Sequence, residues 1–355
     1  MVTIDKSKPI LVTGATGYVA GWVIKKLLEE GLTVHAAVRN PNDHAKLSHL
    51  NELAANSKGQ IKYFKSDLLA NGSYAEAMEG CELVYHTASP FTSNFSDPQK
   101  ELIDPAVLGT KNVLDQANQT ASVKRVVVTS SCAAIYTDCI DVQAAPDGIL
   151  TEKVWNTTAS LEYQPYSYSK TLAEQEAWKM VKDQSRWDLV VVNPCMVLGP
   201  PLNPKTATSE SFHLLKQLGD GTLRMGVPNI GMGVVDVRDL AEAHYQAGFI
   251  PKANGRNIIA GHNTNFLQMA QILHTKFGSQ YKVPNSALPK WLLFLIGPMV
   301  NKAITRKFVR NNVNQVWRAD NLKSKKELGM KYRSLENTMI DSFQSLIDNN
   351  MIQAK

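Results

Sequence analysis

A glycine-rich turn close to the start of the chain restricts the possible folds more than any other feature of the sequence. Residues 13–21 read TGATGYVAG and directly follow the apolar run PILV at residues 9–12. The turn precedes a segment, residues 19–30, whose apolar side chains share one helical face. A strand, a tight turn and a helix in this order begin a βαβ unit, so the sequence favours a parallel sheet covered by helices.

The first half of the sequence repeats this alternation of short β-branched segments and longer helical ones. Gly31 is expected to end the first helix, and the next strand begins two residues later. The six expected strands are Ile10–Thr13, Thr33–Val38, Ile61–Phe64, Leu83–His86, Arg125–Thr129 and Leu189–Val192. This pattern predicts the α/β class, with a doubly wound parallel sheet of the Rossmann type.

A less regular region after Pro194 predicts a second, smaller unit. Prolines and a glycine-rich stretch at residues 219–233 separate short helical segments there. A helix near Val237–Gly248 and a strand near Arg256–Ala260 are expected to return to the sheet, and 355 residues suffice for two units of about 150 residues each. The predicted units are a dinucleotide-binding domain of residues 1–195 and 237–261, and an interleaved C-terminal substrate lobe of residues 196–236 and 262–355.

The glycine turn also has the features of a dinucleotide site. Gly14 permits a tight turn, Gly17 lets the backbone approach a pyrophosphate, and Ala20 lets the helix and strand pack closely. Unpaired N–H groups at the start of the following helix would face the phosphates. The residues predicted to bind the cofactor here are Gly14, Thr16, Gly17, Tyr18 and Val19. The alternative is that the glycines only form an ordinary strand–helix turn.

The end of the second predicted strand decides between NAD and NADP. NAD sites usually place an Asp or Glu about 20 residues after the glycines to bind a ribose, whereas this strand is followed by Arg39. A guanidinium pairs well with a 2′-phosphate, and Lys46 could bind the same phosphate. These two cations favour NADP. The alternative is two solvated cations, with Asp43 holding a ribose. Asp67 and Leu68, after the third strand, are expected at the adenine edge.

Tyr166 and Lys170 form the only Y-x-x-x-K in the chain, and this spacing places both side chains on one helical face. A free tyrosine, with a pKa of about 10, is a poor acid near neutral pH, and the Lys170 cation is expected to lower that pKa. Ser131, after the strand at residues 125–129, would add a hydrogen bond to a substrate carbonyl oxygen. Ser130 is an equal candidate on chemistry alone. The alternative is that the serines only end a strand and the tyrosine only packs in the core.

Composition and charge limit the classes of function. The chain has 38 Lys and Arg against 32 Asp and Glu, and the resulting net charge of +6 suits small anionic ligands but does not indicate nucleic acid. Four scattered cysteines indicate neither a disulfide scaffold nor a zinc site, so no metal is expected. We interpret the basic stretch Lys302, Arg306, Lys307 and Arg310 as a solvated helix face without a specific role.

The chain is expected to be cytoplasmic and to have no membrane partner. Charged residues run directly into the first strand, without the features of a signal peptide. The longest apolar run, residues 291–300, contains Gly297 and Pro298 and is ten residues long, whereas a membrane helix needs about 20. We interpret this run as buried or as facing the substrate. The protein is expected to be a monomer or a homodimer.

Six motifs occur in a fixed order over most of the chain. They are TGxxGxxA at residues 13–20, Val38-Arg39, Asp67-Leu68, Thr129-Ser130-Ser131, Tyr166-x-x-x-Lys170 and NPxxVxGP at residues 193–200. Together they resemble the extended short-chain dehydrogenases/reductases. The segment YSYSKTLAEQEAW at residues 166–178 is most similar to the branch of dihydroflavonol 4-reductases, cinnamoyl-CoA reductases and bacterial aldehyde/ketone reductases.

The resemblance implies roles for individual residues. Ser131 would be the catalytic serine beside Tyr166 and Lys170, while Arg39 and Lys46 would bind the 2′-phosphate. The remaining cofactor-binding residues would be Thr87, Ala88, Ser89, Thr129, Pro194 and Val197, the last two beside the nicotinamide. The residues facing the substrate would be Phe91, His213 and the loop Met225–Met232. The segment Val235–Asp239, also typical of the branch, is interpreted as the start of a helix.

The sequence thus predicts an NADP-dependent oxidoreductase that reduces an aldehyde or ketone, a small-molecule substrate, to the alcohol, with Tyr166 as general acid. The segment Glu162–Pro165 replaces the Trp-containing approach to the tyrosine seen in plant cinnamoyl-CoA reductases, which argues against a CoA thioester. Two alternatives remain. One is a nucleotide-sugar epimerase or dehydratase that retains NAD, and the other is a non-catalytic NADP-binding redox sensor.

Overall fold

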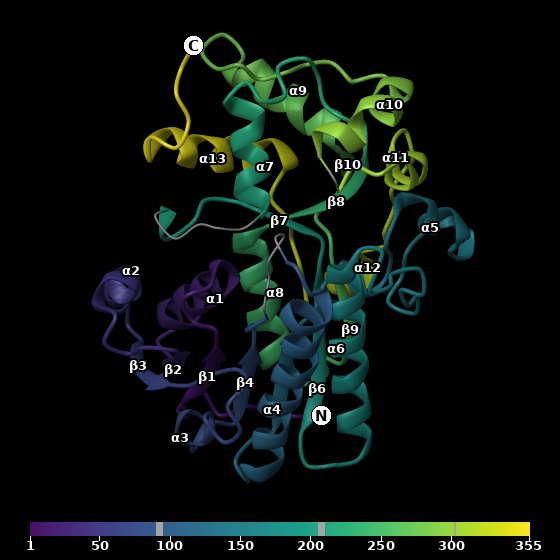
Figure 1. The fold of residues 1–355 in the computed structure, drawn as a ribbon. Helices are drawn as coiled ribbons and strands as arrows, with labels where there is room; N and C mark the ends of the chain where they lie inside the picture. Colours follow the sequence, from purple (N-terminus) through teal and green to yellow (C-terminus); the bar gives the residue numbers. More distant parts are fainter. Residues whose placement is uncertain (90–94, 205–209, 302) are drawn as a thin grey trace.

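The computed structural model describes the whole chain except residues 90–94, 205–209 and 302 (Figure 1). Its largest element is a parallel sheet in the order β3-β2-β1-β4-β5-β6-β9. The strands are β1 (Ile10–Thr13), β2 (Thr33–Val38), β3 (Gln60–Lys65), β4 (Leu83–His86), β5 (Arg125–Thr129), β6 (Asp188–Pro194) and β9 (Gly255–Ile259). The strand order reverses between β1 and β4, so the predicted doubly wound α/β fold is confirmed.

Helices cover both faces of this sheet. Ile10 and Val12 of β1 face one apolar core and Leu11 faces the other, the alternation expected of a strand that is buried on both sides. The helices that close the first core are α1 (Tyr18–Glu29), α2 (His44–Ala55) and α8 (Val237–Phe249). Those that close the second core are α3 (Ala75–Met78), α4 (Asp104–Gln119) and α6 (Pro165–Lys182).

A smaller layer lies beyond the carboxyl end of β6 and occupies the top of Figure 1. Its sheet, in the order β10-β8-β7, consists of β7 (Met196–Leu198), β8 (Gly231–Asp236) and β10 (His262–Asn265). The helices around its own apolar core are α7 (Glu210–Gly219), α9 (Phe266–Phe277) and α13 (Leu335–Asp348). Only Cys195 separates β6 from β7, and α8 directly follows β8, so the chain passes repeatedly between the two layers.

The segment Val235–Asp239 starts α8, as its sequence indicated. The Asp236 side chain accepts a hydrogen bond of 2.9 Å from the backbone N–H of Arg238, which caps the helix. Within the segment 262–355 that the sequence assigns to the lobe, Leu328 and Met330 pack in the first core of the large sheet. The division of the chain into two units stays a prediction.

Most of residues 291–300 are not buried, in contrast to one of the two interpretations from sequence. They form α10 (Lys290–Val300), which packs on α11 (Arg306–Asn312), with Leu293 and Val309 in one apolar cluster and Gly297 against Ile304 just before α11. Trp291 is 64% exposed and Met299 is 86% exposed. No helix in the described part of the chain is long and apolar enough to cross a membrane.

Candidate active site

The glycine turn closes tightly against β4. Gly14 has a φ of 64°, and a Cβ at this position would lie 3.0 Å from Ala88 Cα, so the turn requires glycine. Thr13 Oγ1 accepts hydrogen bonds of 3.1 Å from the backbone N–H groups of Thr87 and Ala88. Gly17 is the N-cap of α1 and places no side chain in front of the first helical N–H groups. The turn therefore offers a closely approachable backbone and a free helix start, as phosphate binding requires.

A cavity of about 730 Å³ extends from this turn to the start of α6. The predicted site residues in its wall are Gly14, Thr16, Gly17, Tyr18, Val19, Arg39, Thr87, Ser89, Thr129, Ser131, Tyr166, Lys170, Pro194 and Val197. Residues in the wall that the sequence analysis did not assign to the site include Ala133, Tyr136, Thr137, Ser167, Met196 and Ser211. Segments that are far apart in the sequence thus meet around one space, at the carboxyl edge of the sheet.

Four predicted cofactor residues, Lys46, Asp67, Leu68 and Ala88, lie outside the wall of this cavity. Lys46 Nζ lies 3.4 Å from the Asp43 carboxylate, which also caps α2. The Asp67 carboxylate accepts a hydrogen bond of 2.9 Å from the backbone N–H of Leu69. Two cations were expected at a 2′-phosphate. Arg39 lines the cavity, whereas Lys46 pairs with Asp43, the N-cap residue of its own helix.

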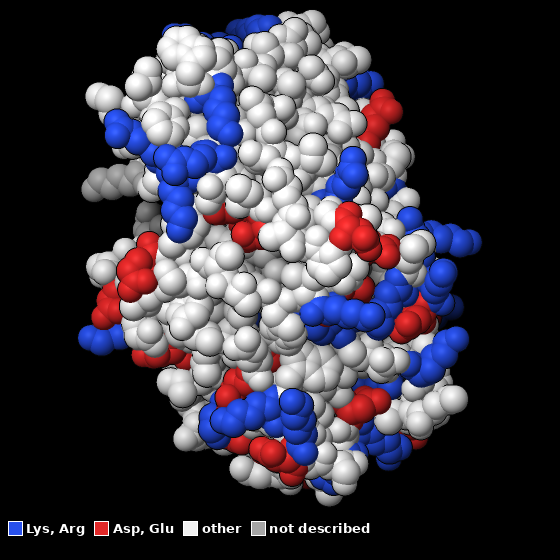
Figure 2. Space-filling model, turned by 90° about the vertical axis from the view of Figure 1, so that its right-hand side faces the viewer, with Lys and Arg blue, Asp and Glu red and all other residues white. Residues whose placement is uncertain are grey.

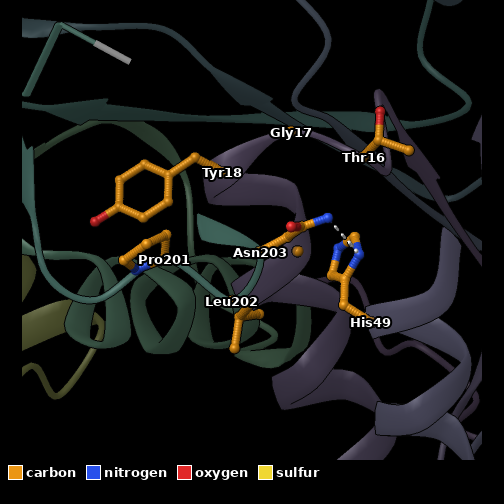
Figure 3. A pocket seen from close by; sticks show the side chains of 8 residues that line it. Thr16, Gly17, Tyr18, His49, Pro201, Leu202 and Asn203 are labelled. Atoms are coloured by element: carbon orange, nitrogen blue, oxygen red, sulfur yellow. Dashed lines mark hydrogen bonds between the residues drawn. The ribbon is translucent and has the colours of Figure 1, made fainter. Parts of the chain in front are cut away.

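A much smaller cavity of about 30 Å³ lies beside the turn (Figure 3). Figure 3 shows the Asn203 side chain directed at His49, and Asn203 Nδ2 lies 3.4 Å from His49 Nδ1. The Tyr18 hydroxyl donates a hydrogen bond of 2.8 Å to the carbonyl oxygen of Gly199. These contacts fix the segment after β7 across α1 and α2. Since the space holds only about one or two waters, we interpret it as part of the supporting structure of the larger cavity.

The candidate catalytic residues come from three elements. Tyr166 and Lys170 lie near the start of α6, and Ser131 is the N-cap of the 3₁₀ helix η2 (Cys132–Ala134), just after β5. A hydrogen bond joins the side chains of Ser131 and Tyr166. Lys170 Nζ donates a hydrogen bond of 2.9 Å to Ser89 Oγ and lies 6.0 Å from the centroid of the Tyr166 ring. The phenol, hydroxyl and ammonium groups therefore face the same space.

The structure distinguishes the two serines that chemistry alone left equal. Ser130 also lines the cavity, but its Oγ donates a hydrogen bond of 2.6 Å to Glu174 Oε2. Ser131 Oγ contacts Tyr166 and also accepts a hydrogen bond of 3.1 Å from the backbone N–H of Ala133. Ser131 is therefore the better candidate for binding a substrate oxygen, as the family resemblance implied.

The sequence analysis did not identify His244, a buried residue of α8 whose ring contacts Thr129 in the cavity wall. Its Nδ1 lies 2.8 Å from the carbonyl oxygen of Leu240, and its Nε2 lies 2.7 Å from Thr129 Oγ1. Burial lowers the pKa of His244 to about 4, so the ring is neutral near pH 7. A neutral ring donates from Nδ1 to the carbonyl and accepts the Thr129 proton at Nε2, which fixes the hydroxyl of a residue in the cavity wall.

The ionisation of Tyr166 differs from the expectation. Burial raises the pKa of Tyr166 to about 12, although the hydrogen bond from Ser131 lowers it in part. Burial also lowers the pKa of Lys170 to about 8, against the opposing effect of the Glu174 carboxylate. The predicted lowering of the tyrosine pKa by Lys170 is therefore not seen in this structure, because desolvation of the phenolate dominates. Near neutral pH the phenol holds its proton and the lysine is charged.

These pKa shifts predict a pH dependence. Lys170 is charged below its pKa and neutral above it, so an activity that needs the ammonium group will be lost on the alkaline side. We expect kcat/KM to be nearly constant below about pH 7, to bend near pH 8, and to fall about tenfold per unit well above it. A steady-state pH profile of the wild type and of Lys170→Arg measures this effect. Because arginine stays charged, the alkaline fall should disappear in that variant; an unchanged fall would contradict the assignment to Lys170.

The wall beyond Ser131 has few charges and suits an uncharged organic substrate. Cys132 and Cys195 meet there with their Sγ atoms 2.9 Å apart, and both are free thiols. His213 does not line the cavity; it is an exposed residue of α7 whose Nε2 lies 3.0 Å from Gln217 Nε2. The loop Met225–Met232 also lies outside the wall. Phe91 lies outside the described residues.

No group of three or more His, Cys, Asp or Glu side chains that could hold a metal ion occurs among the described residues. The polar groups in the cavity wall are hydroxyls, one ammonium and one guanidinium, together with the backbone of the glycine turn. These groups bind anions and oxygen atoms. The cavity therefore resembles a site for a phosphorylated organic molecule.

Comparison with known sequences gives matches over most of the chain. The profile described as the NAD dependent epimerase/dehydratase family matches residues 10–258. Cinnamoyl-CoA reductase CAD2 of Medicago truncatula is 40% identical over 273 residues, covering 76% of this chain and 81% of the relative. Cinnamoyl-CoA reductase 1 of Arabidopsis thaliana is 35% identical over 347 residues, covering 97% and 91%.

Comparison with solved structures gives a match to the complete fold. The yeast methylglyoxal/isovaleraldehyde reductase Gre2, solved in complex with NADPH, has a TM-score of 0.76 and 26% sequence identity to this chain. The alignment covers 97% of this chain and 99% of that one. The similarity therefore includes both the parallel sheet and the smaller layer above it.

Proposed function

The chain belongs to the NAD dependent epimerase/dehydratase family, and from this membership we propose that it is an NADPH-dependent reductase of aldehydes or ketones. Its relatives named above are reductases, so it is an oxidoreductase. The observation that carries the finer proposal is that Ser131, Tyr166 and Lys170 line the same cavity as the glycine turn. A non-catalytic cofactor sensor would need the turn but not these three side chains.

The residues around the turn fit a nicotinamide dinucleotide with a 2′-phosphate. A Cβ at Gly17 would lie 3.1 Å from Gly14 O, so side chains larger than hydrogen would narrow the phosphate-binding turn. Arg39 follows β2 in the cavity wall and forms no ion pair with any described residue. Its guanidinium is thus available for a phosphate. When bound, the cofactor supplies a hydride to the carbonyl carbon of the substrate.

The chain's own residues would supply the proton and the electrostatic stabilisation. Tyr166 holds its proton at neutral pH because its pKa is raised to about 12, and it would donate this proton to the substrate oxygen as negative charge develops there. Ser131 would hydrogen-bond the same oxygen. The Lys170 ammonium would stabilise the phenolate that remains and would bind hydroxyls of the nicotinamide ribose.

The proposal is tested by NADPH oxidation with a panel of aromatic and aliphatic aldehydes and ketones, including a cinnamoyl-CoA thioester. We expect turnover with free carbonyl compounds and weak or no turnover with the thioester. Tight NADPH binding without turnover of any compound would contradict the proposal. An enzyme that retains its cofactor through dialysis and prefers NAD would instead support an epimerase or dehydratase.

Cofactor preference gives a second prediction, about Arg39. Arg39→Ala should weaken NADPH binding by about a hundredfold, the value of a charge-assisted contact to phosphate, and should leave NADH binding nearly unchanged. Lys46→Ala is the matched control; because Lys46 is 60% exposed and paired with Asp43, its effect should be smaller. The measurement is the Kd of each cofactor by fluorescence titration. Equal losses for NADH and NADPH would contradict a role at the 2′-phosphate.

A further inference from the structure

Helix α10 is apolar on nearly every side, yet it lies at the surface. Only Leu293 and Gly297 are buried, and a Cβ at Gly297 would lie 2.7 Å from Ile304 Cγ2, so the contact with the following segment is close. The exposed apolar residues of the helix are Trp291, Leu295, Ile296, Met299 and Val300, at 64%, 56%, 40%, 86% and 77%. A helix that is apolar all round is expected in a core, yet no element in the described part of the chain covers this face.

Basic side chains are exposed beside this face, while Asp138, which accepts hydrogen bonds from Asn311 and Asn312 of α11, is buried. From residue 243 to residue 319 the sequence contains ten Lys and Arg and no Asp or Glu. Arg306, Lys307 and Arg310 are exposed on α11, the helix that packs against α10. Within the described part of the chain, none of these three cations forms an ion pair. In Figure 2, at the height of α10 and α11 in Figure 1, Lys and Arg side chains gather beside a broad white surface.

We propose that the exposed face of α10, with the α11 cations beside it, binds the surface of an anionic phospholipid membrane. Together α10 and α11 place a Trp-containing apolar face beside basic side chains, the combination of apolar and cationic groups by which protein segments bind the membrane–water interface. The apolar side chains enter the boundary of the acyl chains, and Arg306, Lys307 and Arg310 contact anionic headgroups. The contact is peripheral, and the proposal replaces the expectation from sequence of no membrane partner.

Charge distinguishes this occupant from a second copy of the chain. A symmetric dimer through α10 would place the same exposed cations of both copies near each other, whereas Asp138, the carboxylate in contact with α11, is buried and already accepts hydrogen bonds from Asn311 and Asn312. An anionic bilayer complements the cations and also covers an apolar face without requiring a matching shape. The observed surface therefore complements an anionic lipid layer better than it complements the same surface of a second copy.

The test is co-sedimentation of the full chain with phosphatidylcholine vesicles, with and without phosphatidylserine. The wild type should sediment with the anionic vesicles, less with neutral ones, and less at high salt. The triple variant Arg306→Gln/Lys307→Gln/Arg310→Gln should lose about a hundredfold in partition, at about fivefold for each cation. The double variant Trp291→Ser/Met299→Ser should also lose binding, although its net charge is unchanged.

Matched controls separate this site from general basicity. Lys325→Gln/Lys326→Gln/Lys331→Gln removes the same charge from exposed positions elsewhere and should sediment nearly as the wild type does. The double variant Leu69→Ser/Leu322→Ser is the apolar control, since these side chains are 52% and 51% exposed. NADPH oxidation without vesicles checks that each variant is folded. Equal losses in the two charge variants, no sedimentation of the wild type, or a dimer that Trp291→Ser converts to a monomer would each overturn the proposal.

Discussion

Replacing Tyr166 with phenylalanine is expected to lower kcat for carbonyl reduction by about a thousandfold. The substitution removes one oxygen atom from a ring that lines the cavity and keeps its position there. The Kd for NADPH should stay within a factor of about two, because Lys170 and the glycine turn, which we expect to bind the cofactor, are unchanged. Single-turnover kinetics with NADPH and the best aldehyde or ketone measure the loss.

Tyr168→Phe is the matched control for this experiment. Tyr168 lies two residues further along α6 and is not part of the cavity wall, so this variant should keep most of its rate. Lys170→Ala should lower both kcat and NADPH affinity, which distinguishes the lysine from the tyrosine. A Tyr166→Phe enzyme that retained most of its activity would show that another group donates the proton.

Much of the fold could be predicted because its signals are local. The turn at Gly14 and Gly17 and the short β-branched strands are recognisable within ten residues, and the six expected strands overlap β1 to β6. The order of the motifs then predicted which residues meet, since the carboxyl ends of parallel strands share one edge. Fourteen predicted site residues accordingly line one cavity.

Other features depend on contacts that sequence does not specify. Ser130 and Ser131 are adjacent and chemically identical, and only the direction of each side chain separates them. The pKa of Tyr166 depends on how completely the ring is buried, and this effect proved larger than that of Lys170. The apolar run of α10 indicated a buried or substrate-facing segment, but whether another element covers a helix is a property of the tertiary structure. Lys46 was assigned to a phosphate although Asp43 was available to pair with it.

A buried ion pair behind the candidate catalytic serine also went unrecognised, because its partners lie far apart in the sequence. Glu174 Oε1 accepts a hydrogen bond of 2.5 Å from Arg256 Nε, and both side chains are buried. Glu174 Oε2 also accepts hydrogen bonds from Ser130 Oγ and, at 2.8 Å, from Asn193 Nδ2. The same Asn193 Nδ2 lies 3.3 Å from the carbonyl oxygen of Ser131. The pair thus connects α6, β6 and β9 with the backbone of the candidate active site.

We expect Glu174→Ala to lower the free energy of unfolding by about 3–5 kcal/mol, since it leaves the buried Arg256 guanidinium without its counter-ion. Glu176→Ala is the matched control on the same helix; its carboxylate forms a partly exposed pair with Lys179, and the loss should be at most about 1 kcal/mol. Urea unfolding followed by circular dichroism measures both values.

The double variant Glu174→Leu/Arg256→Met tests whether the loss arises from the unpaired charge. Replacing both ions by apolar groups removes the desolvation penalty along with the attraction, so this protein should be more stable than Glu174→Ala. Ser130 and Asn193 would still lose an acceptor, so full recovery is not expected. If the double variant were as unstable as the single one, the loss would come from the hydrogen bonds to Ser130 and Asn193, and Glu174 would act mainly as their acceptor.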